Sequence, residues 1–198
     1  MGSVEEVHEK IMSALRAVEG LPYDGEPVSQ LQHALQCAAL AHDSGAGPEL
    51  VAAALLHDVG RSPVVLNEVG VGRDHGEIAR RWLAPLVGDR VAWLAQGHVP
   101  AKRYLVATDP DYERALSDTS RRTLERQGGP MSPEEVAEFE GHPGWRDAVA
   151  LRRWDDLGKD PETEVPPLEA YVAVVEAVVG AARAQNLSRQ GVPDRVKE

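Results

Sequence analysis

The chain has 198 residues, which is within the usual range of a single domain, and 42% of them are hydrophobic, enough to bury a sizeable core. Lys and Arg number 21 against 32 Asp and Glu, and the net charge of −11 argues against nucleic acid as a partner. No apolar run reaches the roughly 18 residues of a membrane span, and the N-terminal segment lacks the pattern of a signal peptide. We therefore expect a cytoplasmic protein that does not bind membranes.

The composition predicts an all-α fold. Ile, Thr and Phe are rare, whereas Ala, Leu and Glu are abundant, and this balance favours helices over sheets. Apolar residues at steps of three and four predict a first helix over 4–18, and two further helices are expected over 29–42 and 48–59. Residues 50–56 are apolar without a break, which is typical of a helix that is buried on every side.

Gly and Pro residues recur in the middle of the chain, between about residues 60 and 131. Residues 61–73 are therefore predicted to form a loop. Two helices are expected over 75–86 and 90–98, with a bend after Pro100. The polar stretch 108–131, which ends in a Gly-Gly-Pro turn, is expected to be a connection without a long helix.

The last third of the chain again predicts helices. A capping-box sequence with Pro at the first helical position opens a short helix over 133–140, and a further helix is expected over 145–157. The last helix should begin near Pro167. We see no break in composition that would divide the chain, so a single domain is expected over residues 1–184, followed by a polar tail over 185–198.

The chemically informative feature is the pair His57-Asp58 at the end of the most apolar helix. A carboxylate at this position is desolvated and lies near the negative end of the helix dipole, so it needs a cation if it is to stay ionised. A bound metal ion is the simplest such cation. Because one cysteine, Cys37, is too few for a thiolate metal site, any metal must be held by His and carboxylate side chains.

Four more residues of metal-ligand type lie where apolar helix faces begin or end. They are His33, His75, His98 and Asp155. Each has an ordinary alternative, because a lone helical His is usually packed or solvated, and Asp155 could pair with Arg152 or Arg153 on a solvated helix face. Together with His57-Asp58, however, they offer four imidazoles and two carboxylates from five helices, and this set favours a metal centre.

Five segments of the chain match the pattern of one known family. They are YDGEPVSQLQHALQCAALA (23–41), LVAAALLHDVG (50–60), GHVPAKRYLVATDPDY (97–112), RQGGPMSPEEVAEFE (126–140) and LRRWDD (151–156). The order of a His, an adjacent His-Asp pair and a distant Asp resembles the HD-domain superfamily. The five segments together resemble one branch of it, the mixed-valent di-iron oxygenases that cleave organophosphonates, over about residues 20–180.

This resemblance implies a helical-bundle HD domain that holds two iron ions as an Fe(II)/Fe(III) pair. It implies that His33, His57, Asp58 and Asp155 hold one iron and that His75 and His98 hold the second, with Asp58 bridging the two. The implied reaction uses O2 to oxidise the hydroxyl-bearing carbon of a small 1-hydroxyphosphonate, and it breaks the C–P bond to give phosphate and a carboxylic acid. The oligomeric state is not readable from the sequence.

The resemblance also implies roles in substrate binding. Tyr23 would be a labile iron ligand that the substrate displaces, and Glu26 would recognise an amino group of the substrate. Lys102 would bind the phosphonate, with Ser120 and Thr123 as weaker candidates for the same role. The ordinary alternatives are loop residues for Tyr23 and Glu26, a surface cation for Lys102 and a helix cap for Ser120.

Arg61 departs from the family pattern, in which the type member has a histidine at this position. An arginine carries a permanent charge and a planar set of donors, which suits an anion and fits an ammonium group poorly. Alternatively, Arg61 holds Glu26 in place by an ion pair. The identity of the 1-hydroxyphosphonate, with or without an N-methylated amine, therefore stays open.

Two other classes of function are weighed against the oxygenase. The same ligands fit a divalent-metal phosphohydrolase that acts on a nucleotide or phosphoester with Mn or Co, since sequence does not separate these metals from iron. The segments around Tyr23, Glu26 and Lys102 favour the oxygenase. A catalytically idle HD module is disfavoured because all six ligands are present.

Overall fold

The structure, a computed structural model, describes residues 2–23 and 25–190, and within them it contains ten α-helices, two 3-10 helices and no β-strand, so the all-α prediction is confirmed. The helices are α1 (Val4–Arg16), α2 (Gln30–Asp43), α3 (Pro48–Leu56), η1 (Val59–Arg61), α4 (Pro63–Val69), α5 (His75–Thr108), α6 (Tyr112–Ala115), α7 (Asp118–Arg126), α8 (Pro133–Gly141), α9 (Trp145–Leu157), η2 (Leu168–Tyr171) and α10 (Val172–Gln190). Among these helices, none is both long enough and apolar enough to cross a bilayer.

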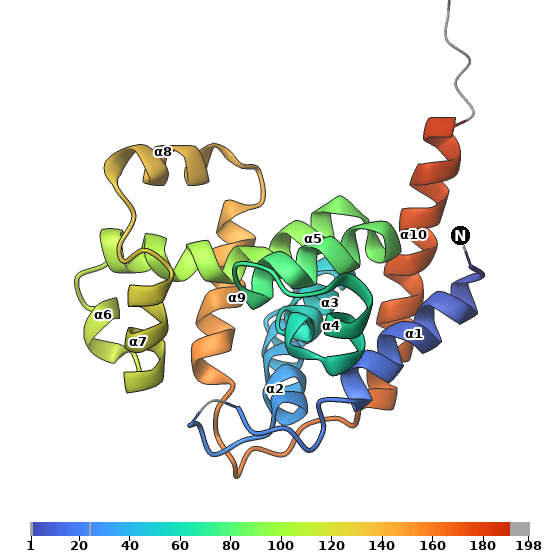
Figure 1. Cartoon of the computed structure of the whole chain (residues 1–198), viewed down its shortest axis with the longest axis horizontal. Helices are drawn as coiled ribbons and strands as arrows, with labels where there is room; N and C mark the ends of the chain where they lie inside the picture. The colour runs from blue at the N-terminus through green and yellow to red at the C-terminus, as the bar shows by residue number, and fades with distance from the viewer. Residues whose placement is uncertain (1, 24, 191–198) are drawn as a thin grey trace, which may run out of the picture.

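Helix α3 lies at the centre of the bundle, where α2, α5, α9 and α10 pack around it (Figure 1). All six side chains from Val51 to Leu56 are buried, which confirms the prediction of a helix that is apolar on every side. Helices α1 and α10 pack together on one flank, and α6, α7 and α8 lie on the opposite flank (Figure 1). The central position of α3 carries the residues that follow it, His57 and Asp58, into the interior.

Helix α5 consists of two helical segments that meet at Gly88, whose φ is 85°. This break lies between the helices predicted over 75–86 and 90–98, so both are confirmed. The second segment, however, continues past Pro100 to Thr108, where a bend was predicted. Because a straight helix of 23 residues spans about 35 Å, the chain must reverse at Gly88 for His75 and His98 to meet, and their Nε2 atoms are 2.8 Å apart. The helix continues past Pro100 because Ala101 and the residues after it bury an apolar face, which offsets the lost hydrogen bond.

Two predicted connections contain helices. The predicted loop over 61–73 includes α4, which has Pro63 at its first position and Gly70, at φ 73°, just after its end. The predicted connection over 108–131 includes α6 and α7, and Ser117 caps α7 with its side chain. The loop prediction over 61–73 was wrong, and the short helices α6 and α7 were not predicted, because these Gly, Pro and Ser residues mark the ends of short helices.

The elements near the C-terminal end follow the prediction more closely. The predicted capping box opens α8, and α9 has the predicted bounds of 145–157. The last helix begins after the short η2 turn and continues beyond Ala184, where a polar tail was expected, as far as Gln190. The remainder of that expected tail, residues 191–198, lies outside the described residues.

Candidate metal centre and substrate cavity

Asp58 is a buried carboxylate whose oxygens are free to bind a cation. Among the described residues, none donates a hydrogen bond to either oxygen. His75 Nε2 lies 2.9 Å from Oδ1, and Arg61 Nε lies 3.4 Å from Oδ2. Burial alone would raise the pKa of Asp58, but the charge of Arg61 and the neighbouring His75 and His57 hold it well below its usual range. Asp58 is therefore an anion with unused lone pairs.

A glycine allows this carboxylate to approach α5. A Cβ atom at Gly60 would lie 2.0 Å from the carbonyl oxygen of His75 and 2.8 Å from the backbone nitrogen of Ala79. Because Gly60 has no Cβ, η1 packs directly on the first turn of α5. This close backbone approach places Asp58 beside His75.

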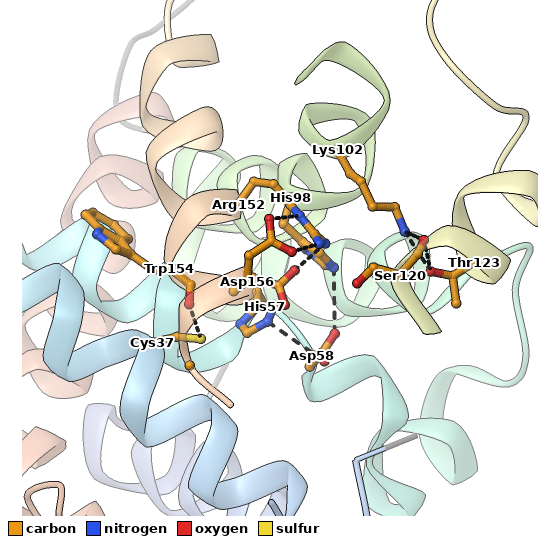
Figure 2. A network of polar contacts seen from close by, with 12 residues as sticks. Cys37, His57, Asp58, His98, Lys102, Ser120, Thr123, Arg152, Trp154 and Asp156 are labelled. Carbon is orange, nitrogen blue, oxygen red and sulfur yellow. Dashed lines mark hydrogen bonds and ion pairs between the residues drawn. The ribbon is translucent and has the colours of Figure 1, made fainter. Parts of the chain in front are cut away.

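Two clusters of ligand atoms meet at Asp58. In the first, His33 Nε2 lies 3.1 Å from His57 Nε2 and 3.3 Å from Asp155 Oδ1. In the second, the Nε2 atoms of His75 and His98 lie 2.9 and 3.7 Å from Asp58 Oδ1. Asp58 Oδ2 lies 3.8 Å from His57 Nε2, so each carboxylate oxygen faces one cluster (Figure 2). A carboxylate that bridges two metal ions requires this arrangement.

Backbone carbonyls orient three of the four imidazoles. The Nδ1 atoms of His33, His57 and His98 lie 2.7, 2.8 and 2.5 Å from the carbonyl oxygens of Gly158, Ala54 and Ala95. A carbonyl oxygen only accepts hydrogen bonds, so each Nδ1 carries the hydrogen and each Nε2 offers a lone pair to the cluster. Metal-binding histidines are typically oriented in this way.

The two facing lone pairs of His33 and His57 require a cation. Burial lowers the pKa of His57, which keeps this ring neutral. Burial would also lower the pKa of His33, but the neighbouring Cys37 and Asp155 outweigh this effect and raise it well above its usual range. A proton on His33 can therefore hold the two rings together, and a metal ion fits the same donor set in place of that proton.

Cys37 lies in the first cluster without being placed as a ligand. Its Sγ is 3.8 and 3.7 Å from the two ring nitrogens of His33, so the sulfur does not lie along the Nε2 lone pair. The thiol instead donates to the carbonyl oxygen of Trp154 (Figure 2). The sulfur nevertheless lies within 4.8 Å of the donor atoms of His33 and His57, so Cys37 belongs to this group of possible metal ligands.

Arg152 fixes the orientation of Asp155. Its Nη1 donates to Asp155 Oδ2 at 2.6 Å, which leaves Oδ1 to face His33 and to accept from the Tyr23 hydroxyl at 3.2 Å. Arg152 and Asp155 are 4% and 2% exposed, so the alternative of a solvated ion pair is wrong. Burial raises the pKa of Asp155, but Arg152 and the hydrogen bond from His33 lower it well below its usual range. The sequence therefore indicated the partner Arg152 correctly, but not that the pair is buried and orients Asp155 toward His33.

A cavity of about 500 Å³ ends on these clusters. Its lining includes all six predicted substrate residues, namely Tyr23, Glu26, Arg61, Lys102, Ser120 and Thr123. Among the described residues, seven Lys and Arg side chains line it against three carboxylates. The cavity is therefore cationic although the chain carries a net charge of −11, and it suits a small anion.

Lys102 lies at the inner end of this cavity. It is 2% exposed, so the alternative of a surface cation is wrong. Its Nζ donates to Thr123 Oγ1 at 2.7 Å and to the Ser120 carbonyl oxygen at 3.4 Å (Figure 2). Ser120 is not the cap of α7, because that role belongs to Ser117. One face of α7 thus carries both hydroxyl residues that were predicted beside Lys102.

The cation beside Glu26 is Lys159. Lys159 Nζ lies 3.5 Å from Glu26 Oε1, and the Ser117 hydroxyl donates to the same oxygen at 2.8 Å. Arg61, which was considered as a partner of Glu26, lies against Asp58 and places its guanidinium 5.7 Å from the centroid of the Tyr23 ring. Lys159 was not predicted as a site residue, because a single Lys after the end of a helix belongs to no recognisable sequence motif.

The buried helix ending in His-Asp, and the His and Asp side chains that neighbouring helices bring to it, define an HD domain. The family model described as HD domain matches residues 31–136, and the chain belongs to this family.

Two of its relatives are named as phosphonate dioxygenases. Hydroxymethylphosphonate dioxygenase of Gimesia maris is 40% identical over 85% of this chain and 88% of the relative. The glycine-betaine-forming 1-hydroxy-2-(trimethylamino)ethylphosphonate dioxygenase of Leisingera caerulea is 37% identical over 79% of this chain and 82% of the relative. These similarities confirm the resemblance to the phosphonate-cleaving branch.

Proposed function

We propose that the protein is a di-iron oxygenase that uses O2 to cleave the C–P bond of a small 1-hydroxyphosphonate. One O2 is consumed for each substrate, and its two oxygen atoms balance the carboxylic acid and phosphate that are formed. The observation that carries this proposal is the cationic cavity that ends on two ligand clusters joined by Asp58. The names of two relatives, both phosphonate dioxygenases, support it.

The donor set fits two iron ions. One ion would be held by His33, His57, Asp58 and Asp155, and the other by Asp58, His75 and His98. Imidazole nitrogens and carboxylate oxygens are ordinary ligands of iron, and the buried Asp58 carboxylate, which faces both clusters, favours a cation at each of them. When bound, the iron pair would supply the activation of O2 and the removal of electrons from the substrate.

The side chains around the clusters would bind and orient the substrate. Lys102 would neutralise the phosphonate at the inner end of the cavity, and Ser120 and Thr123 lie beside it. The Tyr23 hydroxyl, which donates to Asp155, lies at the edge of the first cluster and would be displaced when the substrate hydroxyl enters. Binding of both the phosphonate and the hydroxyl group would fix the hydroxyl-bearing carbon of the substrate beside the metal pair. This lowers the entropic part of the activation barrier.

The proposal is tested by metal analysis, EPR and product assays on the purified protein. We expect two iron ions per chain, a coupled Fe(II)/Fe(III) signal after partial oxidation, and phosphate release that consumes O2 in a one-to-one ratio. Phosphate release in the absence of O2 would instead assign the site to a hydrolase. Failure of the iron-loaded, reduced protein to release phosphate from any 1-hydroxyphosphonate would refute the proposed substrate class.

The pH dependence of substrate binding should follow Lys102. Burial, followed by the nearby charge of Arg152, lowers the pKa of Lys102 to about 7. Only the protonated form attracts a phosphonate, so we expect kcat/KM to fall about tenfold per pH unit above pH 8. Initial rates of phosphate release between about pH 6 and 9 measure this. The decline should flatten in Lys102→Arg, because Arg stays charged. A decline that persists unchanged in that variant would exclude Lys102 as its origin.

Replacing Arg61 with His, the residue of the family's type member, should change the order of preferred substrates. Arg61 is longer than His and permanently charged, and it lies over Tyr23 in the cavity wall, so the change alters both volume and field. We expect kcat/KM for a 1-hydroxyphosphonate with an ammonium tail to rise about tenfold relative to hydroxymethylphosphonate. Because Arg61 also lies near Asp58, the metal content of the variant is the control. An unchanged order of substrates, with normal metal content, would show that Arg61 does not shape the pocket.

A further inference from the structure

The cavity has two ends that one helix face connects. Ser117, Ser120 and Thr123 follow one another at intervals of three residues along α7, and they reach Glu26, Lys159 and Lys102 respectively. Six residues of α-helix span about 9 Å, which is the length scale of a small phosphonate with a short tail. With the phosphonate at Lys102, the tail of the substrate would therefore point toward Glu26.

We infer that Lys159 determines substrate specificity: it cancels the charge of Glu26, so that the site accepts 1-hydroxyphosphonates whose tail carries no positive charge. This inference rests on the proposed function and narrows its substrate class. It selects a substrate whose tail is uncharged, or absent as in hydroxymethylphosphonate, over substrates with an ammonium-bearing tail.

The geometry around Glu26 supports this assignment. Lys159 Nζ lies 3.5 Å from Glu26 Oε1, and the two side chains are only 13% and 14% exposed, so water screens their interaction weakly. Oε1 also accepts the hydrogen bond from Ser117. The acidic group that would otherwise bind an ammonium group thus already has a cation and a hydroxyl as partners.

The two cations near Tyr23 differ in their carboxylate neighbours. Lys159 Nζ and the Arg61 guanidinium lie 5.9 and 5.7 Å from the centroid of the Tyr23 ring. Arg61 pairs with Asp58, a predicted metal ligand, whereas Lys159 pairs with Glu26. An ammonium group that enters beside Glu26 therefore meets a carboxylate whose charge Lys159 already offsets, whereas an uncharged tail does not need that carboxylate.

Lys159 has one alternative role that makes a different prediction. Its Nζ also lies 3.5 Å from Ser120 Oγ, near the expected position of the phosphonate. If Lys159 binds the phosphonate, its removal lowers kcat/KM equally for all substrates. If it cancels the charge of Glu26, its removal changes the ratio of kcat/KM between substrates with charged and uncharged tails. The ratio of kcat/KM values therefore separates the two roles.

The experiment uses pairs of substrates that differ in charge but not in shape. One pair is 2-amino-1-hydroxyethylphosphonate and 1-hydroxypropylphosphonate. The other is the N-trimethylated 2-amino-1-hydroxyethylphosphonate and 1-hydroxy-3,3-dimethylbutylphosphonate. Phosphate release under O2 is measured for the iron-loaded wild type and for Lys159→Met, which keeps the length of the side chain. We expect the wild type to prefer the uncharged member of each pair, and Lys159→Met to shift the ratio toward the ammonium member by about tenfold.

Three control variants identify the cause of the shift. Lys159→Arg keeps the charge and should keep the wild-type ratio. Lys10→Met changes the net charge equally, but Lys10 pairs with Glu68 outside the cavity, so the ratio should not change. In a Glu26→Gln background the effect of Lys159→Met on the ratio should become smaller, because the carboxylate that Lys159 occupies is gone and only the direct repulsion between Lys159 and the ammonium tail remains.

The outcomes separate this inference from the proposed function. A wild type that prefers the ammonium members, or a Lys159→Met variant that weakens both members equally, would overturn the role of Lys159 while leaving C–P cleavage in place. If Lys159→Met loses iron or unfolds, the wild-type preference and the ratio in Lys159→Arg still test the inference. No phosphate from any of the four substrates in the wild type would refute the proposed function itself.

Discussion

Asp58→Ala is expected to remove both metal ions and to lower kcat by at least about a thousandfold. One oxygen of Asp58 faces each ligand cluster, so a single substitution deprives both ions of a ligand. Metal content per chain on the purified variant, together with phosphate release, measures this. His98→Ala is the matched comparison, because His98 belongs to the second cluster alone and its loss should chiefly empty one site.

The fold should survive the loss of Asp58. Its removal breaks the ion pair with Arg61, whose side chain is partly exposed, but leaves the apolar core unchanged. The far-UV circular dichroism of metal-free Asp58→Ala should therefore match that of the metal-free wild type. If a folded Asp58→Ala protein retains two metal ions per chain, Asp58 does not bridge them.

Lys102→Ala is expected to lower kcat/KM for the phosphonate by about a hundredfold or more, chiefly through KM, while the metal content stays normal. Lys102 is a buried cation at the inner end of the cavity. Its Nζ donates hydrogen bonds to Ser120 and Thr123, which are not predicted metal ligands. Steady-state kinetics and metal analysis measure the two quantities separately.

Two further variants refine the Lys102 experiment. Lys102→Met keeps most of the side-chain volume, so a similar loss in this variant shows that charge, not packing, is responsible. Thr123→Val removes the hydroxyl that accepts from Lys102 but keeps the cation, and we expect a loss of less than about tenfold. Loss of metal in Lys102→Ala would instead give Lys102 a structural role at the metal centre.

The parts of the fold that depend on local chemistry could be predicted from the sequence. Helices α8 and α9 follow the prediction because a capping box and a regular apolar pattern specify them within a few residues. The break at Gly88 also lies between the helices predicted over 75–86 and 90–98, but the continuation of α5 past Pro100 could not be predicted, because it depends on packing against helices that are distant in the sequence. The short helix α7 was missed because its polar sequence buries only Ser120 and Leu124.

In the candidate site, too, some features could be predicted from the sequence and others could not. The six predicted ligands come together because a carboxylate after a fully apolar helix must be buried, and burial demands a cation. The pairing of Glu26 with Lys159 could not be predicted, since it joins two loop residues 133 positions apart and neither lies in a pattern that points to the other.

The reversal of α5 at Gly88 also has a consequence for the order in which the two metal clusters assemble. His75 and His98 are 23 positions apart, whereas His33 and Asp155 are 122 positions apart. The chain entropy lost on closing a loop grows with the logarithm of its length, so the longer closure costs about 1.5 kcal/mol more. The contact between His75 and His98 thus has a low sequence separation, and we expect it to form early in folding. The contact between His33 and Asp155 is expected to form only after α9 has packed against α2. The two histidines of the second metal position accordingly come from one hairpin, whereas the first position needs ligands from helices across the tertiary fold.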